Sequence, residues 1–168
     1  VLTIIGLVSR ALLQPFSTQH DGWQFSSYPL LDLWGVWDTG LYTLIASQGY
    51  PDVPAGQPIS FSYGFFPLYP LTMRLIGLLL RAQSPNLDGF FHSGIIISNL
   101  SLLLSSFYLY KLLRLDENES TALRSVKYLF LFPSAMFLSC VYPELLILLL
   151  IILAFYCARK QRWWLAGI

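Results

Sequence analysis

Two stretches, WDTGLYTLIASQGY at residues 37–50 and FFPLYP at residues 65–70, decide how this chain is organised. In the first stretch, Asp38 stands where a helix N-cap is expected and Gly49 where a helix ends. Between them, apolar residues recur at helical intervals, at Leu41, Tyr42, Leu44 and Ile45. This pattern predicts a helix of about ten residues, which is too short to cross a bilayer and is expected to lie along its interface.

The composition indicates a membrane protein. Of the 168 residues, 55% are hydrophobic and only 11% are charged, and the mean hydropathy is +0.59. Soluble domains carry about 25% charged residues. We therefore predict an all-α, polytopic transmembrane protein. The sequence contains no basic patch that would suggest a nucleic-acid partner.

Residues 17–89 differ from the rest of the chain because proline and glycine interrupt them repeatedly. Such residues break helices, so we expect a long loop with short interfacial helices here. Together with this loop, the whole of residues 1–168 is interpreted as a single transmembrane domain, the N-terminal portion of a longer protein. Its expected membrane helices cover residues 90–110, 126–141 and 142–158, with part of a first one at 1–16 and the start of another at 163–168.

The course of residues 65–81 decides the topology. This segment is apolar, but Pro67, Pro70 and Arg74 interrupt it, and an arginine at mid-membrane costs on the order of 3 kcal/mol. If it crossed, both later basic clusters would share a side with residues 11–73, which contain no Lys or Arg, against the positive-inside tendency. We therefore expect the segment to stay on the outer face. The two clusters, predicted to be cytoplasmic, are Lys111, Arg114, Arg124, Lys127 and Arg159, Lys160, Arg162.

Asp38 is the main candidate for chemistry in the predicted outer loop. As an N-cap it would accept hydrogen bonds from backbone N–H groups. As a general base at the mouth of a membrane cavity it would take the proton from a sugar hydroxyl. Trp37 is expected to anchor the loop at headgroup level. Tyr42 follows Asp38 by one helical turn, and either orients the carboxylate or serves as an interfacial aromatic.

Two arginines and a second acid complete the candidate set. Arg74 and Arg81 are seven residues apart on one helical face, where they would either grip a phosphate through paired hydrogen bonds or extend to lipid headgroups. Glu144 follows the expected outer turn, where it either caps the next helix or acts as a second active-site carboxylate. His20 and His92 have no metal-ligand spacing, so we predict neither a metal nor a cofactor.

Several short motifs, taken together and in order, resemble the PIG-V family of mannosyltransferases, especially its bacterial relatives. They are Trp37-Asp38, Tyr42, Ile45-Ala46, Gly49-Tyr50, the run at 65–70 with Arg74, Ser98-Asn99-Leu100, Phe132-Pro133, Phe137-Leu138-Ser139 and Tyr142-x-Glu144.

The resemblance implies a GT-C fold whose long first outer loop carries the catalytic acid, with Asp38 matching that aspartate and Glu144 the later acidic position. The chain departs from the family pattern at Pro143, where Thr is usual. The implied enzyme transfers mannose, with inversion, from a polyprenyl- or dolichyl-phosphate donor to a lipid-linked or glycan acceptor, as in GPI-anchor biosynthesis. It would be integral to the bacterial inner membrane, or to the endoplasmic reticulum membrane if the protein is eukaryotic.

A competing hypothesis is a transporter or lipid-binding membrane subunit without catalysis. Transporters place charged groups and broken helices near the bilayer midplane. Here the acids gather in the expected outer loops, which favours the enzyme.

Overall fold

The computed structural model describes residues 8, 25–26, 28–52, 61–80 and 87–167. These residues form helices and turns, with no strand among them, so the all-α prediction is confirmed. The expected helix at 1–16 falls almost entirely outside the described residues, as do His20 and Arg81. The chain divides into two compact units, one of Val1–Ile96 with Cys140–Tyr142 and the other of Ile97–Ser139 with Pro143–Ile168.

The first unit contains the predicted interfacial helix, α3 (Thr39–Gln48). Asp38 occupies its N-cap position, and the helix ends at Gly49, whose positive φ of 82° suits glycine. The Gly49 N–H donates to the Ile45 carbonyl at 2.8 Å and closes the last turn. Helix α3 thus has the start and the end that the sequence predicts.

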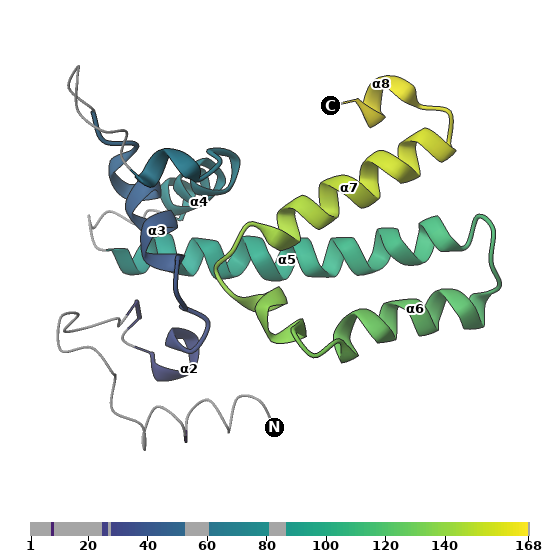
Figure 1. Ribbon diagram of the computed structural model, residues 1–168, viewed down its shortest axis with the longest axis horizontal. Helices are drawn as coiled ribbons and strands as arrows, with labels where there is room; N and C mark the ends of the chain where they lie inside the picture. The colour runs from purple at the N-terminus through teal and green to yellow at the C-terminus, as the bar shows by residue number, and fades with distance from the viewer. Residues whose placement is uncertain (1–7, 9–24, 27, 53–60, 81–86, 168) are drawn as a thin grey trace. The chain divides into compact units, whose positions relative to one another are not determined.

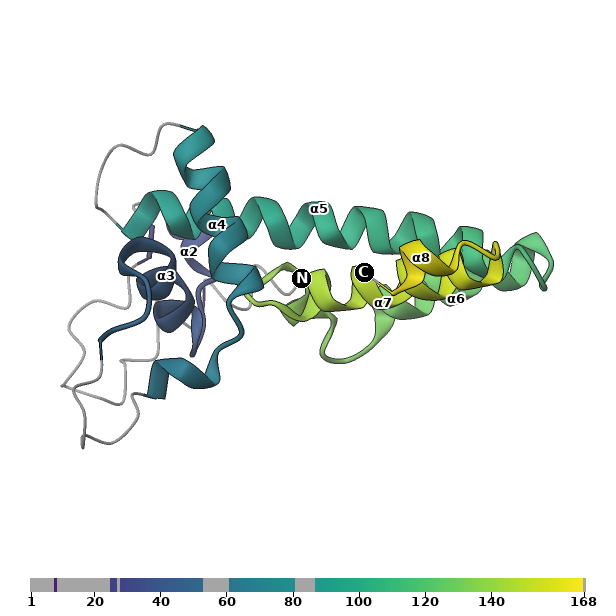
Figure 2. The same ribbon diagram turned by 90° about the horizontal axis from the view of Figure 1, so that it is seen from above.

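Helix α4 (Leu68–Leu79) packs against α3, as Figures 1 and 2 show. Pro70 fits because it lies in the first turn, where backbone N–H groups have no partner within the helix. At 12 residues α4 is about 18 Å long, well short of the roughly 30 Å apolar core of a bilayer. One face of α4 is buried at Tyr69, Met73 and Gly77, whereas the opposite face exposes apolar side chains, those of Leu71, Leu75, Leu78 and Leu79.

The first turns of helix α5 (Leu87–Leu113) pack against the buried face of α4, and Gly94 lies at this contact. A Cβ atom on Gly94 would lie 2.4 Å from Val141 Cγ1 and 3.2 Å from Met73 Cε, so only glycine permits this approach. The Tyr69 hydroxyl donates to the Gly94 carbonyl at 3.2 Å. Other short elements of the unit are α2 (Pro29–Asp32) and η1 (Phe61–Gly64).

The second unit contains the rest of α5, then α6 (Glu119–Leu131), η2 (Ala135–Ser139), α7 (Glu144–Arg159) and α8 (Trp163–Ala166). Within the described ranges, α5 is the one helix long and apolar enough to cross a membrane, over Asp88–Leu113. The predicted helices at 90–110 and 142–158 correspond to α5 and α7.

The expected continuous helix at 126–141 is wrong. Helix α6 begins earlier, because the Asn118 side chain accepts the Thr121 N–H at 2.9 Å and caps it. It also ends earlier, at Leu131, because Pro133 forces the preceding Phe132 into an extended conformation. Turns and η2 form the remainder.

The far ends of α5 and α7 meet through one bidentate ion pair. The Arg159 guanidinium donates to both carboxylate oxygens of Asp116, at 2.6 and 2.5 Å. This hydrogen bonding lowers the pKa of Asp116 and raises that of Arg159. Tyr108 and Tyr156 also meet edge-to-face, with ring centroids 5.6 Å apart.

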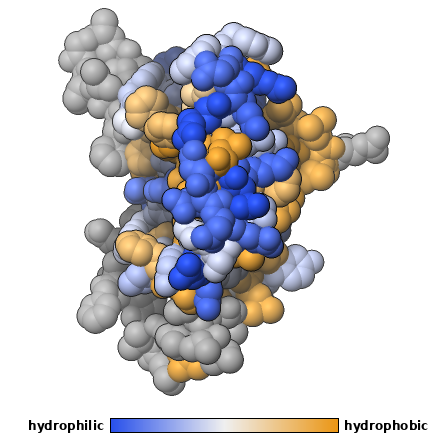
Figure 3. Space-filling view, turned by 90° about the vertical axis from the view of Figure 1, so that its right-hand side faces the viewer, coloured by the Kyte–Doolittle hydropathy of each residue, from blue (hydrophilic) through white to orange (hydrophobic). Residues whose placement is uncertain are grey.

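Figure 3 looks onto this end of the unit, where hydrophilic side chains gather. Both predicted basic clusters therefore begin at one end of the second unit.

Candidate functional site

The site is built around the turn that leads into α3. A segment from much later in the chain, Cys140–Tyr142, packs against this turn, and we call it the strap. The Val141 N–H donates to the Trp34 carbonyl at 3.1 Å, and the Thr39 hydroxyl contacts the Val141 carbonyl at 3.5 Å. Val141 is fully buried, so these contacts restrain the turn on the side that faces the protein interior.

Asp38 lies at the end of this turn with its carboxylate exposed. Its backbone carbonyl accepts from the Leu41 and Tyr42 N–H groups at 2.9 and 3.2 Å, which starts α3. The carboxylate itself makes no capping hydrogen bond. It also has no hydrogen-bond or ion-pair partner among the residues that the structure describes. The capping interpretation of the side chain is therefore wrong.

Trp37 precedes Asp38 with a backbone φ of +39°. This left-handed conformation is strained for a large side chain and persists only where the surroundings impose it. The indole is 68% exposed beside Asp38. Its exposure suits the predicted role of a headgroup-level anchor.

Tyr42 lies on the buried face of α3, in a cluster of aromatic rings. Its ring meets those of Phe65, Tyr69 and Tyr142 edge-to-face, with centroids 5.0, 5.4 and 6.2 Å apart. The Asp38 carboxylate accepts no hydrogen bond from its hydroxyl. In this geometry Tyr42 supports the site through packing one turn below Asp38.

The other predicted charged residues lie on different elements. Arg74 is exposed on α4, and no described residue pairs with its guanidinium. Glu144 is exposed and begins α7, where a carboxylate matches the positive end of the helix dipole. Glu144 belongs to the second unit, and Pro143 alone separates it from Tyr142 of the strap.

Comparison with known families agrees with this arrangement of motifs. The sequence model of the family described as mannosyltransferase (PIG-V) matches residues 13–166. The chain belongs to the PIG-V mannosyltransferase family. No curated protein and no solved structure matches it. The matched range includes the Asp38 turn, α4 and the strap, so the resemblance seen in the motifs is confirmed.

An aromatic hollow not foreseen from the sequence adjoins the end of α3. It encloses about 420 Å³ and is lined by Tyr50, Tyr63, Gly64, Phe65, Phe66 and Pro67. The Tyr50 and Tyr63 rings stack at 5.4 Å, and the Tyr50 hydroxyl donates to the Phe65 carbonyl at 2.5 Å. Burial raises the pKa of Tyr50, so its hydroxyl keeps its proton. The family motifs contain Tyr50 and Phe65, but their sequence spacing of fifteen gives no local sign that they meet.

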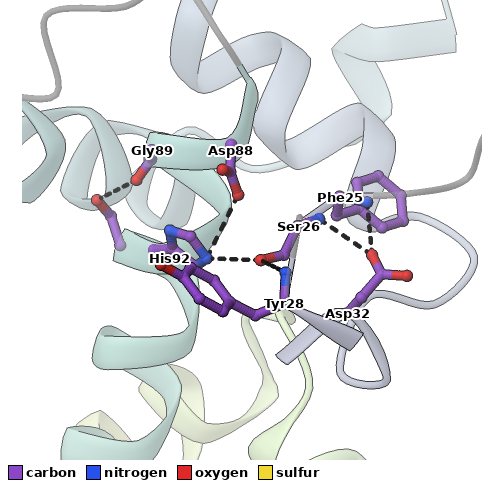
Figure 4. Close-up of polar contacts among 8 residues, drawn as sticks. Phe25, Ser26, Tyr28, Asp32, Asp88, Gly89 and His92 are labelled. Atoms are coloured by element: carbon purple, nitrogen blue, oxygen red, sulfur yellow. Dashed lines mark hydrogen bonds and ion pairs between the residues drawn. The ribbon is translucent and has the colours of Figure 1, made fainter. Parts of the chain in front are cut away.

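A second polar cluster, drawn in Figure 4, brings a serine, a histidine and two aspartates together. Ser26 Oγ lies 2.9 Å from His92 Nε2, and Asp88 Oδ1 lies 3.3 Å from the same nitrogen. A hydrolytic triad needs the acid on one ring nitrogen and the serine on the other. Asp32 accepts the N–H groups of Phe25 and Ser26 instead. In this PIG-V family member the cluster ties the segment before α2 to α5 and is structural.

Proposed function

We propose that this protein is an integral membrane glycosyltransferase of the GT-C type, which transfers mannose from a polyprenyl- or dolichyl-phosphate mannose to a glycan or glycolipid acceptor. Family membership supports mannosyl transfer. The single observation that carries the mechanism is the exposed carboxylate of Asp38, which has no partner among the described residues and lies on a fixed turn. A general base must be both accessible and held in place.

In the proposed reaction, the Asp38 carboxylate takes the proton of an acceptor hydroxyl as that oxygen attacks the anomeric carbon of the donor mannose. The bond from that carbon to the phosphate oxygen breaks, and the lipid phosphate leaves with the electron pair. Attack from the face opposite the phosphate inverts the anomeric centre and gives an α-mannoside. A phosphate ester is already a good leaving group, so the enzyme mainly supplies the base, positioning and charge stabilisation.

Arg74 is proposed to bind the departing phosphate. Its guanidinium is exposed and unpaired among the described residues, and the planar fork of Arg matches two phosphate oxygens. Arg81, one cation further along the chain, is proposed as a second phosphate or headgroup contact. Glu144 is proposed as the second active-site carboxylate, and Trp37 and Tyr42 as residues that shape the substrate site.

The proposed topology places residues 17–89 on the outer face, periplasmic or lumenal. The ion pair between Asp116 and Arg159 supports it, because this contact brings the two basic clusters to one end of the second unit. That end is then cytoplasmic by the positive-inside tendency. If α5 crosses the membrane, its first residue and the loop before it, from residue 17, lie on the opposite face.

A transporter remains the competing class, and the charges of α5 and α7 argue against it. Asp88 and Lys111 lie near the two ends of α5, and Glu144 and Arg159 are the terminal residues of α7. A transporter would be expected to hold ionisable groups near the bilayer midplane. Here the apolar interiors of both helices contain no Asp, Glu, Lys or Arg.

The test is mannosyl transfer by the intact protein in membranes, with a panel of radiolabelled donors. We expect label to move from polyprenyl-phosphate mannose to a lipid or glycan acceptor. A nucleotide sugar supplied to washed membranes without polyprenyl phosphate should give no product. Direct use of the nucleotide sugar, or transfer of a different sugar only, would overturn the proposal.

A further inference from the structure

The Tyr142 hydroxyl lies between the two peptide groups that flank Trp37. It donates to the Val36 carbonyl at 3.0 Å and accepts from the Asp38 N–H at 3.0 Å. One hydroxyl therefore ties both sides of the turn. Tyr142 follows Asp38 by 104 positions and Val36 by 106 positions, so no local sequence pattern predicts these two contacts.

The turn that this hydroxyl holds is strained. Trp37 has a φ of +39°, a left-handed conformation that is unfavourable for a large residue. It persists only when neighbouring interactions fix it. The Tyr142 bonds fall immediately before and after Trp37, at Val36 and Asp38. A second restraint comes from Thr39, whose hydroxyl accepts the Val36 N–H at 3.0 Å.

We propose that Tyr142 is a positioning residue for Asp38 and sets the direction of its carboxylate through the backbone. The inference rests on the proposed function, in which Asp38 is the base. Since no described side chain hydrogen-bonds the carboxylate, its position depends on where the backbone places the Asp38 Cα–Cβ bond. The backbone at Trp37 and Asp38 places that bond, and the Tyr142 hydroxyl fixes this backbone.

Tyr142→Phe separates this role from ordinary packing. The substitution removes only the hydroxyl and keeps the buried ring, which contacts Tyr42 at 6.2 Å. Tyr50→Phe is the matched control, because its hydroxyl also donates to a backbone carbonyl in the same unit, that of Phe65, but away from the Asp38 turn. Tyr142→Phe loses two hydroxyl–backbone hydrogen bonds and Tyr50→Phe loses one, so a purely structural role predicts a lower Tm in both variants without a selective loss of kcat in Tyr142→Phe.

The expected result in the intact protein is a kcat for Tyr142→Phe reduced about 10- to 100-fold, since small misplacements of a reacting group have effects of that size. KM for the lipid donor should stay within about twofold, because the change affects the base and not binding. Tyr50→Phe should keep near wild-type kcat. Thr39→Val, which removes the other restraint on the turn, should lower kcat in the same way if Tyr142→Phe proves too unstable to assay.

Double variants distinguish the inference from the proposed function beneath it. If Tyr142 acts through Asp38, then Asp38→Asn combined with Tyr142→Phe is no slower than Asp38→Asn alone. An inactive Asp38→Asn together with a fully active Tyr142→Phe overturns the positioning role and leaves the base in place. Multiplied losses in the double variant also overturn it. A fully active Asp38→Asn overturns the proposed mechanism itself.

Discussion

Replacing Gly94 by alanine should destabilise the protein, although alanine is normally the better helix residue. Gly94 lies in α5, where a new Cβ would come within 2.4 Å of Val141 Cγ1. No side chain tolerates that distance, so Val141 would have to move. Val141 is fully buried, and its backbone is hydrogen-bonded to Trp34 and Thr39, so the movement would pass from the strap to the turn that leads into α3.

Two opposing terms set the size of the effect. Alanine gains about 1 kcal/mol over glycine in a helix interior. Overpacking a buried site costs about 1–3 kcal/mol, and the 2.4 Å contact at Gly94 places this site toward the upper value. The net loss is then about 2 kcal/mol. For a chain of this size it corresponds to a fall in Tm of about 4–8 °C.

Thermal unfolding in detergent measures this shift, with Gly40→Ala as control. A Cβ on Gly40 would meet its nearest atom, Phe25 Cε1, at 3.6 Å, an ordinary contact, so its Tm should stay level or rise. Adding Val141→Ala to Gly94→Ala removes the clashing methyl and should recover part of the loss. A Tm for Gly94→Ala at or above the wild-type value would refute the packing described for this unit.

Three further predictions concern the donor phosphate, the membrane topology and one ion pair. Arg74→Lys should weaken use of the lipid-phosphate donor, seen as a lower kcat/KM, because the bidentate fork is lost although the charge remains; unchanged kinetics would remove Arg74 from the site. A cysteine at Asn118 should resist an impermeant thiol reagent in intact cells, because that loop is predicted to be cytoplasmic, and rapid labelling would contradict the topology. The Asp116–Arg159 pair should stabilise the protein fully above the ordinary Asp pKa and lose this effect as pH falls through the lowered pKa of Asp116. The gap in Tm between wild type and Asp116→Asn should therefore close in acid, and a widening gap would be the contrary result.

Local signals allowed the helices to be predicted where caps and periodicity agree. Helix α3 has both a start at Asp38 and a stop at Gly49, and its bounds follow from them. Hydropathy alone predicts the wrong bounds for the helix at 126–141, because it does not register that Pro133 ends the helix. The Asn118 cap and the proline define α6 better than its apolar residues do.

The site was predictable only in part. Asp38 stands out in the sequence because it heads a short helix in a stretch without cations. Its link to Tyr142 does not, since the two residues meet only after more than a hundred intervening positions have folded. Tyr42 follows Asp38 by four residues, one helical turn, but its ring lies on the buried face of α3. The spacing in the sequence alone does not show this burial.

The most direct test of the account is mannosyl transfer and Tm measured together for Asp38→Asn in the intact protein. The Asp38 carboxylate makes no capping bond, so Tm should stay at the wild-type value. Transfer should fall roughly 10²- to 10⁴-fold, because the base that accepts the hydroxyl proton is gone. Transfer at a near wild-type rate would contradict the central claim and leave Glu144 as the remaining candidate for the base.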